Sequence, residues 1–190
     1  MLGAVTGVIL LVLIVLLVVI ALWWIATYNR LVALREQIRN SWSQIDVQLK
    51  RRHDLIPNLV ETVKGYLQHE RGTLEAVTQA RAAALSAGSM PERLQAEGTL
   101  SGALRGLMIA VEAYPDLKAS ANFIQLQEEL TGTENKIAFA RQHYNDVVAV
   151  YNALRLSFPA SIVATSGGFA PEEYFELDVP AERNVPRVQF

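Results

Sequence analysis

Apolar residues recur every seven positions along residues 117–158, and this spacing predicts one long helix with a buried seam. Small or apolar residues also stand three positions after most seam residues, and Gly132 is the single glycine of the stretch. A helix of this length is marginal in water by itself, so we expect partner helices along the seam. The predicted bundle-core residues are Phe123, Leu130, Ile137, Tyr144, Tyr151 and Phe158.

The N-terminal segment is apolar without interruption, since residues 2–27 contain no charged side chain. A stretch of about 20 such residues is long enough to cross a bilayer as a helix. A cleaved signal peptide fits less well, because no Lys or Arg precedes the run and two indoles stand where small residues would be needed. We therefore predict a permanent membrane anchor at residues 1–28. The expected membrane-interface residues are Trp23, Trp24, Tyr28 and Arg30.

The distribution of basic residues predicts the orientation of this anchor. None precedes the apolar run, and several follow it at once: Arg30, Arg35, Arg39, Lys50, Arg51 and Arg52. The positive-inside rule then places the N-terminus outside and the C-terminal domain in the cytoplasm of a bacterial inner-membrane protein, crossing once. The absence of cysteine agrees with a reducing compartment.

The helical pattern continues beyond the anchor, with apolar residues on one stripe as far as Leu49. We expect this first bundle helix to stop near residues 52–54, with Asp54 as the N-cap of a second helix and Pro57 in its first turn. The second helix is predicted to end at Ala87-Gly88.

A third helix is predicted from a capping box at Ser89 and Glu92 and extends to about residue 113. Beyond Phe158 the chain becomes rich in Pro, Gly and spaced aromatic residues, which indicates an extended C-terminal arm packed on the bundle rather than a loose tail. The predicted fold is thus all-α: a single transmembrane helix (1–28) continuing into an antiparallel four-helix-type bundle (29–158), with an extended arm (159–190).

The sequence offers little for catalysis or metal binding. His53, His69 and His143 lack a second ligand at helical spacing, so no metal site is predicted. Phosphate-binding loops, a cysteine nucleophile and serine-hydrolase motifs are absent, so we expect no enzyme and no cofactor. The net charge of −2 and the scattered basic residues argue against nucleic acid as a partner.

Several polar side chains lie on or beside the predicted seams. Charges there are costly unless paired, and we expect inter-helix pairs that fix the register rather than a ligand site. The residues concerned are Glu70, Arg81, Glu134 and Arg141. The pairs Tyr144-Asn145 and Tyr151-Asn152 lie one heptad apart and place side-chain amides beside aromatic core positions. The alternative to a structural role for these amides is a polar surface that binds a partner.

Several segments together resemble the LemA family, and the resemblance covers nearly the whole chain. They include Ile-Asp-Val-Gln-Leu-Lys-Arg-Arg-His-Asp-Leu-Ile-Pro at 45–57, Tyr-Pro-Asp-Leu-Lys-Ala at 114–119, Leu-Gln-Glu-Glu-Leu at 126–130 and Thr-Glu-Asn-Lys-Ile-Ala at 133–138. The resemblance implies a bacterial membrane protein with a helical bundle and no established catalytic activity. It also implies kinship with a protein that helps to make magnetosome membranes.

The predicted function is a non-enzymatic, membrane-anchored scaffold that associates with itself and organises or shapes the inner membrane. The last helix carries apolar residues off its seam, so we expect an oligomer or partner surface at Val148, Val150 and Leu156. The expected partners are the lipid bilayer and other copies of the chain. The alternative is an adaptor that uses this surface to bind another membrane protein, such as a protease or transporter.

Overall fold

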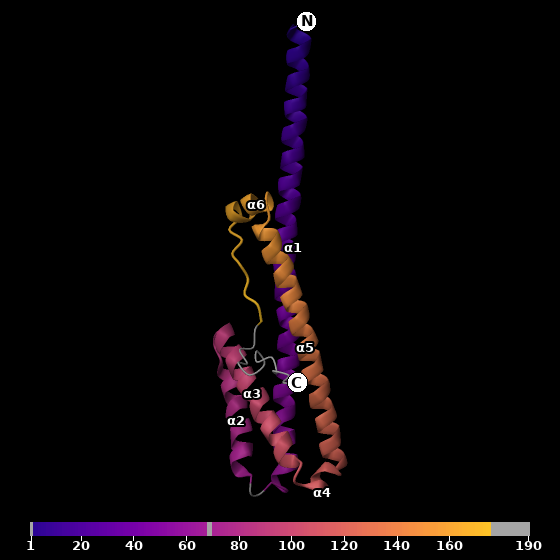
Figure 1. Cartoon of the computed structure of the whole chain (residues 1–190), viewed down its shortest axis with the longest axis vertical. Helices are drawn as coiled ribbons and strands as arrows, with labels where there is room; N and C mark the ends of the chain where they lie inside the picture. Colours follow the sequence, from indigo (N-terminus) through magenta and orange to yellow (C-terminus); the bar gives the residue numbers. More distant parts are fainter. Residues whose placement is uncertain (1, 68–69, 176–190) are drawn as a thin grey trace, which may run out of the picture. The chain divides into compact units, whose positions relative to one another are not determined.

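The computed structural model describes residues 2–67 and 70–175, and all regular secondary structure within them is helical. This confirms the predicted all-α class (Figure 1). The helices are α1 (Leu2–Lys64), α2 (Arg71–Ser86), α3 (Met90–Val111), α4 (Pro115–Lys118), α5 (Ala121–Leu156) and α6 (Ala160–Ser166).

Helix α1 does not stop at residues 52–54, as predicted, but continues through Pro57 to Lys64. Asp54 is therefore an interior residue of α1 and not an N-cap. The apolar stripe explains the continuity, because Leu49, Ile56 and Val63 are all buried at successive intervals of about two helical turns. Burial of this stripe offsets the cost of a proline inside the helix, about 3 kcal/mol.

Helices α2 and α3 are joined by a short turn whose chemistry follows the prediction. Ser89 accepts a hydrogen bond from the main-chain N–H of Glu92, and the Glu92 carboxylate accepts one from the N–H of Ser89. The predicted capping box is thus confirmed. These main-chain hydrogen bonds also hold the pKa of Glu92 below its ordinary value.

The last two helices differ from the prediction at their ends. Residues 115–118 form the separate short helix α4, and α5 begins only at Ala121. Beyond Leu156 the chain bends by 97° into α6, within the segment predicted to be wholly extended. The extended part begins after Gly168, which has a positive φ of 67° that suits glycine. The remainder of the predicted arm, 176–190, lies outside the described residues.

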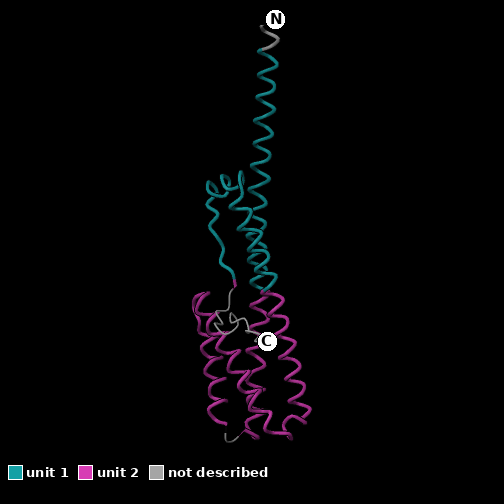
Figure 2. Tube along the Cα trace, in the orientation of Figure 1, with its two compact units in different colours: residues 1–43, 142–174 teal, residues 44–141, 175–190 magenta. Residues whose placement is uncertain are grey.

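The chain divides into two compact units, coloured separately in Figure 2. Of the described residues, unit 1 contains 2–43 and 142–174, and unit 2 contains 44–67, 70–141 and Phe175. Helices α1 and α5 each contribute residues to both units.

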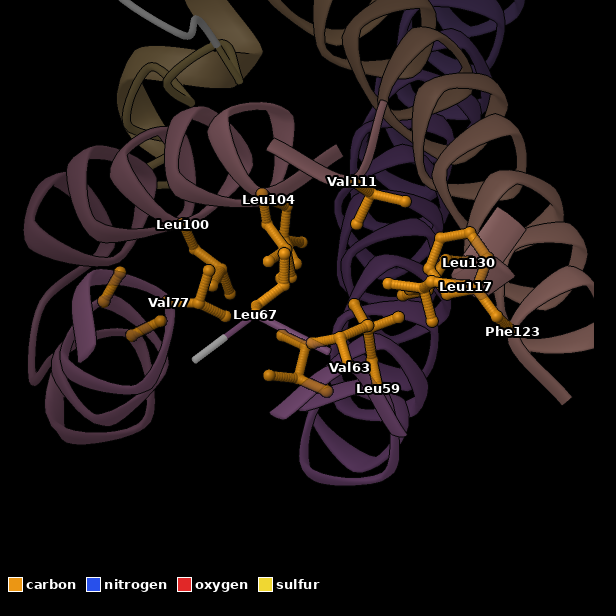
Figure 3. Packing of buried hydrophobic residues seen from close by; sticks show 14 residues of the cluster. Leu59, Val63, Leu67, Val77, Leu100, Leu104, Val111, Leu117, Phe123 and Leu130 are labelled. Atoms are coloured by element: carbon orange, nitrogen blue, oxygen red, sulfur yellow. The ribbon is translucent and has the colours of Figure 1, made fainter. Parts of the chain in front are cut away.

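The core of unit 2 draws apolar residues from α1, α2, α3, α4 and α5 (Figure 3). Figure 3 shows Leu59 and Val63 of α1, Leu104 of α3, and Leu117 of α4 among the residues of this core. In unit 1 a second set of buried apolar residues joins α1, α5, α6 and the segment that follows: Leu31, Ile38, Tyr144, Val147, Val148, Tyr151, Ala160, Val163, Ala164 and Phe169.

Five of the six predicted core residues on α5 are buried, namely Phe123, Leu130, Ile137, Tyr144 and Tyr151. Phe158, predicted as the sixth, is instead 84% exposed. The heptad pattern requires a continuing helix, whereas α5 ends at Leu156 and the chain changes direction. Phe158 therefore leaves the seam.

Candidate functional site

Arg52 of α1 is almost completely buried in unit 2, where it contacts side chains of two other helices. It forms an ion pair with Glu97 of α3, which is buried as well. Its Nη1 donates to Oε1 of Glu134 on α5 at 2.6 Å and to Oγ of Ser101 at 2.9 Å. One guanidinium thus connects α1, α3 and α5.

His53, the neighbour of Arg52, completes this arrangement. Its Nε2 lies 3.0 Å from Oε1 of Glu97, and its side chain is also buried. We call Arg52, His53, Glu97 and Glu134 the buried charge cluster. Burial raises the pKa of Glu97, but the neighbouring His53 and Arg52 lower it by more, so that this pKa lies below its ordinary value. Glu97 is therefore ionised at neutral pH.

The geometry of the cluster fixes the register of α1, α3 and α5 relative to one another. Removal of one partner would leave a buried charge unpaired, which costs roughly 3–5 kcal/mol. A shift of α1, α3 or α5 by one residue along its axis would separate these partners. A cleft of about 300 Å³, lined by Ser101, Gln127 and Glu134 among others, leaves the Glu134 side chain 42% exposed.

The four polar residues singled out from the sequence lie in different surroundings. Glu70 is the N-cap residue of α2 and makes no side-chain capping hydrogen bond. Arg81 donates from Nε to the main-chain oxygen of His53 at 2.7 Å. Glu134 belongs to the buried charge cluster, and Arg141 lies over the ring of Phe175, 4.7 Å from its centroid.

Sequence reasoning missed Arg52 and Glu97, although a signal for both was present. Arg52 stands between the buried Leu49 and Ile56, and Glu97 precedes Leu100 and Leu104 at helical spacing. Each occupies a position of its apolar stripe. A charged residue on an apolar stripe must be buried and therefore needs a partner of opposite charge. An Arg on one stripe and a Glu on another thus indicate an inter-helix pair more directly than charges that lie beside a stripe.

The histidines considered as metal ligands are spread over the chain. His53 lies in the buried charge cluster, His143 is exposed on α5, and His69 lies outside the described residues. Within residues 2–67 and 70–175 no group of three or more His, Asp and Glu side chains is arranged to hold a metal ion.

In unit 1 the polar groups of α5 hold the chain's own C-terminal segment. The Tyr151 hydroxyl donates to the Ala170 carbonyl at 2.8 Å, and the Tyr144 hydroxyl donates to the Glu173 carbonyl at 3.0 Å. Asn152 donates to the Glu172 carbonyl at 2.9 Å and accepts from the Glu172 N–H at 3.2 Å. These three side chains therefore bind the C-terminal arm. While they do so, they are not available to bind a partner protein, which was the alternative interpretation.

Burial and nearby carboxylates affect both tyrosines of this contact. Burial raises the pKa of the Tyr144 hydroxyl, and the charges of Glu172 and Glu173 raise it further. Burial also raises the pKa of Tyr151, with a smaller contribution from Glu172. Both hydroxyls consequently stay protonated, as donation to carbonyl oxygens requires.

The predicted outer surface of α5 is only partly exposed. Val148 is fully buried, contrary to the prediction, whereas Val150 is 48% exposed and Leu156 is 69% exposed. Val148 shares a helix face with Tyr144 and Asn152, which bind the segment 170–173. Val148 is therefore a core residue of unit 1, and only Val150 and Leu156 of the predicted surface remain exposed.

The predicted membrane-interface residues lie near the end of the apolar part of α1. Trp23, Trp24 and Arg30 are exposed. Tyr28 packs edge-on against the ring of Phe169, with 5.3 Å between the ring centroids, and Arg35 lies 5.3 Å from the same ring centroid. Phe169 thus docks the C-terminal segment on α1 close to the aromatic belt.

One described helix, α1, is by itself long and apolar enough to cross a membrane, and its most apolar window has a mean hydropathy of 3.4 with no residue buried. This apolar segment leads into the helices described above. Residues 41–190 match the model of the LemA family. The chain belongs to the LemA family. The resemblance noted from the sequence is therefore confirmed.

The chain is similar to several relatives at low identity. The chain is 26% identical over 175 residues to magnetosome protein MamQ 2 of Paramagnetospirillum magneticum, and 26% identical over 174 residues to magnetosome protein MamQ of Magnetospirillum gryphiswaldense; each alignment covers 78% of this chain and 64% of the relative. It is 29% identical over 140 residues to protein LemA of Metamycoplasma hominis, covering 72% of this chain and 63% of that protein. The chain thus spans slightly less than two thirds of each relative.

Proposed function

We propose that this LemA-family chain is a non-enzymatic scaffold, anchored in a membrane by α1 and assembled from several copies of itself. The observation that carries the proposal is the apolar segment of α1, which has no buried residue in its most apolar window and belongs to the same helix as the core residues Leu59 and Val63. About 20 apolar residues without internal contacts are stable in lipid and not in water.

The proposed location is the bacterial inner membrane, with one crossing, the N-terminus outside and the other helices in the cytoplasm. The support is the basic residues on the C-terminal side of the apolar segment: Arg30, Arg35 and Arg39 follow it within one short stretch. Protease added to intact spheroplasts is expected to leave the chain beyond Tyr28 uncut.

A role without catalysis is supported by the contacts of the buried charged side chains. Arg52, His53 and Glu97 are enclosed among helices and pair with one another, which suits a fixed register better than substrate turnover. We also propose that the chain acts without a cofactor.

Self-association is supported by large apolar side chains that remain exposed within each unit. Phe139 and Ile109 in unit 2 are 73% and 68% exposed, and Val150 in unit 1 is 48% exposed. Tethering every copy to one membrane plane reduces the translational and rotational freedom lost on association. Modest contacts, repeated head-to-tail around the membrane normal, could then build a ring or an array. We also propose that the assembled scaffold organises or shapes the membrane; two relatives of the chain are named magnetosome proteins.

The test is purification of the full chain in a mild detergent, followed by measurement of particle mass. A large homogeneous particle containing only this chain is expected, and Phe139→Glu is expected to reduce its size. Gln142→Glu, which adds the same charge at an exposed polar position of α5, should leave the size unchanged. A monomer that copurifies with one stoichiometric membrane protein would instead favour the adaptor role, and a monomer alone would contradict both.

A further inference from the structure

The turn between α5 and α6 exposes three large apolar side chains. Leu156 is 69% exposed, Phe158 is 84% exposed and Ile162 is 53% exposed, all within seven consecutive residues. We call residues 156–162 the α5–α6 elbow. Exposed apolar residues that cluster in this way are unusual on a surface that meets water.

The elbow lies beside the end of the apolar segment of α1. A cleft of about 310 Å³ is lined on one side by Trp23, Ala26, Thr27 and Arg30 of α1, and on the other by Leu154, Ser157, Phe158, Pro159 and Ala160. Trp23 and Phe158 thus border the same cleft within unit 1, and in Figure 1 α6 lies next to α1. Trp residues gather where a span leaves the hydrocarbon, so the proposed anchor would set this cleft at the level of the lipid headgroups.

Several main-chain donors of the elbow are bonded within the chain. The N–H of Ser157 bonds to the Ala153 carbonyl at 3.0 Å, the N–H of Ser161 bonds to the Ser157 carbonyl at 2.8 Å, and Ile162 donates to the Pro159 carbonyl at 3.1 Å. Pro159 itself has no N–H to satisfy. Internally bonded donors lower the cost of placing this segment against lipid.

The charges around the elbow are of one sign. Residues 147–171 contain Arg155 and no other charged residue, and the first charged residue of α1 is Arg30, which lines the cleft. Acidic side chains return only at Glu172. A surface of apolar and aromatic residues with cations alone is complementary to a leaflet that carries anionic lipids.

From these observations we infer that the α5–α6 elbow is a second membrane contact, inserted into the headgroup region of the same leaflet from which α1 emerges. The inference rests on the proposed membrane anchor and specifies its partner: the glycerol and upper acyl region of a phospholipid bilayer, with Phe158 as the deepest elbow residue. Lipid is favoured over a second copy of the chain because the elbow is continuous with the aromatic belt at Trp23.

The test uses the full chain, which has no cysteine, with one cysteine introduced at a time and labelled with an environment-sensitive fluorophore. The labelled positions are Phe158→Cys and Ile162→Cys in the elbow, Leu16→Cys in the apolar part of α1, and Gln142→Cys on α5. Gln142 is exposed and lies about 20 Å along the helix from Leu156. Each variant is reconstituted into vesicles of phosphatidylethanolamine and phosphatidylglycerol that contain lipids carrying a doxyl quencher either near the headgroup or near the chain end.

The expected result is that labels at positions 158 and 162 emit at shorter wavelength than the label at 142. They should be quenched more by the shallow doxyl lipid than by the deep one. The label at 16 should be quenched more by the deep lipid, and the label at 142 by neither. Circular dichroism of each variant in vesicles verifies that its helices are retained.

The possible failures are distinguishable. If the label at 16 responds as expected while 158 and 162 behave like 142, the anchor stands and the elbow contact is wrong. If 158 and 162 emit at shorter wavelength without quenching by either lipid, the elbow is covered by protein, and a second copy becomes its occupant. If the label at 16 escapes quenching, both the anchor and the elbow contact are wrong.

Discussion

Arg81 of α2 donates its Nε hydrogen to the main-chain oxygen of His53 on α1, at 2.7 Å. This oxygen is the one that an N–H at position 57 would bond in a regular helix, and Pro57 has no N–H. A side chain from another helix therefore satisfies the acceptor that the proline leaves unpaired. The same contact fixes α2 to α1 at the position of the buried charge cluster.

The first prediction concerns this contact. Arg81→Ala is expected to lower the free energy of unfolding by about 1–3 kcal/mol, because a partly buried carbonyl loses its donor. In a Pro57→Ala background the new N–H can bond to the His53 oxygen, so the same substitution should cost less than about 1 kcal/mol. Denaturant unfolding of the detergent-solubilised chain measures both values, and equal costs in the two backgrounds would show that Arg81 stabilises α1 in another way.

The second prediction concerns Arg52 and Glu97. Glu97→Ala is expected to lower the free energy of unfolding by roughly 3–5 kcal/mol, because the Arg52 charge stays buried without its main partner. Glu61→Ala removes one carboxylate of an exposed pair with Lys64, at 3.3 Å, and serves as the control. It should change stability by less than about 0.5 kcal/mol. A small effect at position 97 would mean that the cluster opens to water in solution.

The third prediction is a dependence of stability on acid pH. The pKa of Glu97 is lower in the folded chain than its ordinary value of 4.5, so the unfolded chain binds more protons on acidification. The stabilisation is present above the ordinary pKa and is lost as the pH falls through the folded pKa. Thermal unfolding of wild type and Glu97→Gln, compared from about pH 6 down to about pH 3, should show the steeper fall for wild type; parallel curves would exclude a contribution from Glu97.

A fourth prediction tests the seam of α5. Ile137→Ala should lower the free energy of unfolding by about 2–4 kcal/mol, because a buried side chain is replaced by a smaller one and leaves a cavity. Gln142→Ala, at an exposed position of the same helix, should change it by no more than about 0.5 kcal/mol. Similar losses from both substitutions would contradict the assigned phase of the helix.

The fifth prediction tests the attachment of the C-terminal segment. Asn152 makes two hydrogen bonds with the main chain of Glu172, so Asn152→Ala should release the segment 170–174 from α5. Limited proteolysis after Glu172 or Glu173 should become faster, while Asn122→Ala, at an exposed position near the start of α5, should leave the rate unchanged. Unaltered cleavage in Asn152→Ala would show that the contacts of Tyr144, Tyr151 and Phe169 hold the segment without Asn152.

Particular residues show how far the sequence predicts this fold. Heptad spacing is a property of one helix, so it places Phe123, Leu130, Ile137, Tyr144 and Tyr151 correctly on a buried face. The capping box at Ser89 and Glu92 is also local, and it is found as expected. These features depend only on residues close together in the sequence.

The errors arise where distant residues decide the outcome. Pro57 normally marks a helix boundary, but Arg81 supplies the missing donor from 28 residues farther along the chain. Val148 lies off the heptad seam and resembles a surface residue in the sequence, but it is buried in the folded chain. Arg52 and Glu97 are 45 residues apart, and periodicity within one helix carries no information about which helices will meet. Each error follows from a tertiary contact that overrides a local pattern.

The capped turn between α2 and α3 has a consequence for the order of folding. Ser89 and Glu92 fix this connection with bonds across three residues, whereas Arg52 must find Glu134 across 82 residues of chain. Contacts close in sequence form before distant ones, since a shorter loop closes at a smaller entropic cost. The α2–α3 hairpin should therefore be complete while α5 is still being synthesised, so that α5 can pack on a folded surface as soon as it leaves the ribosome.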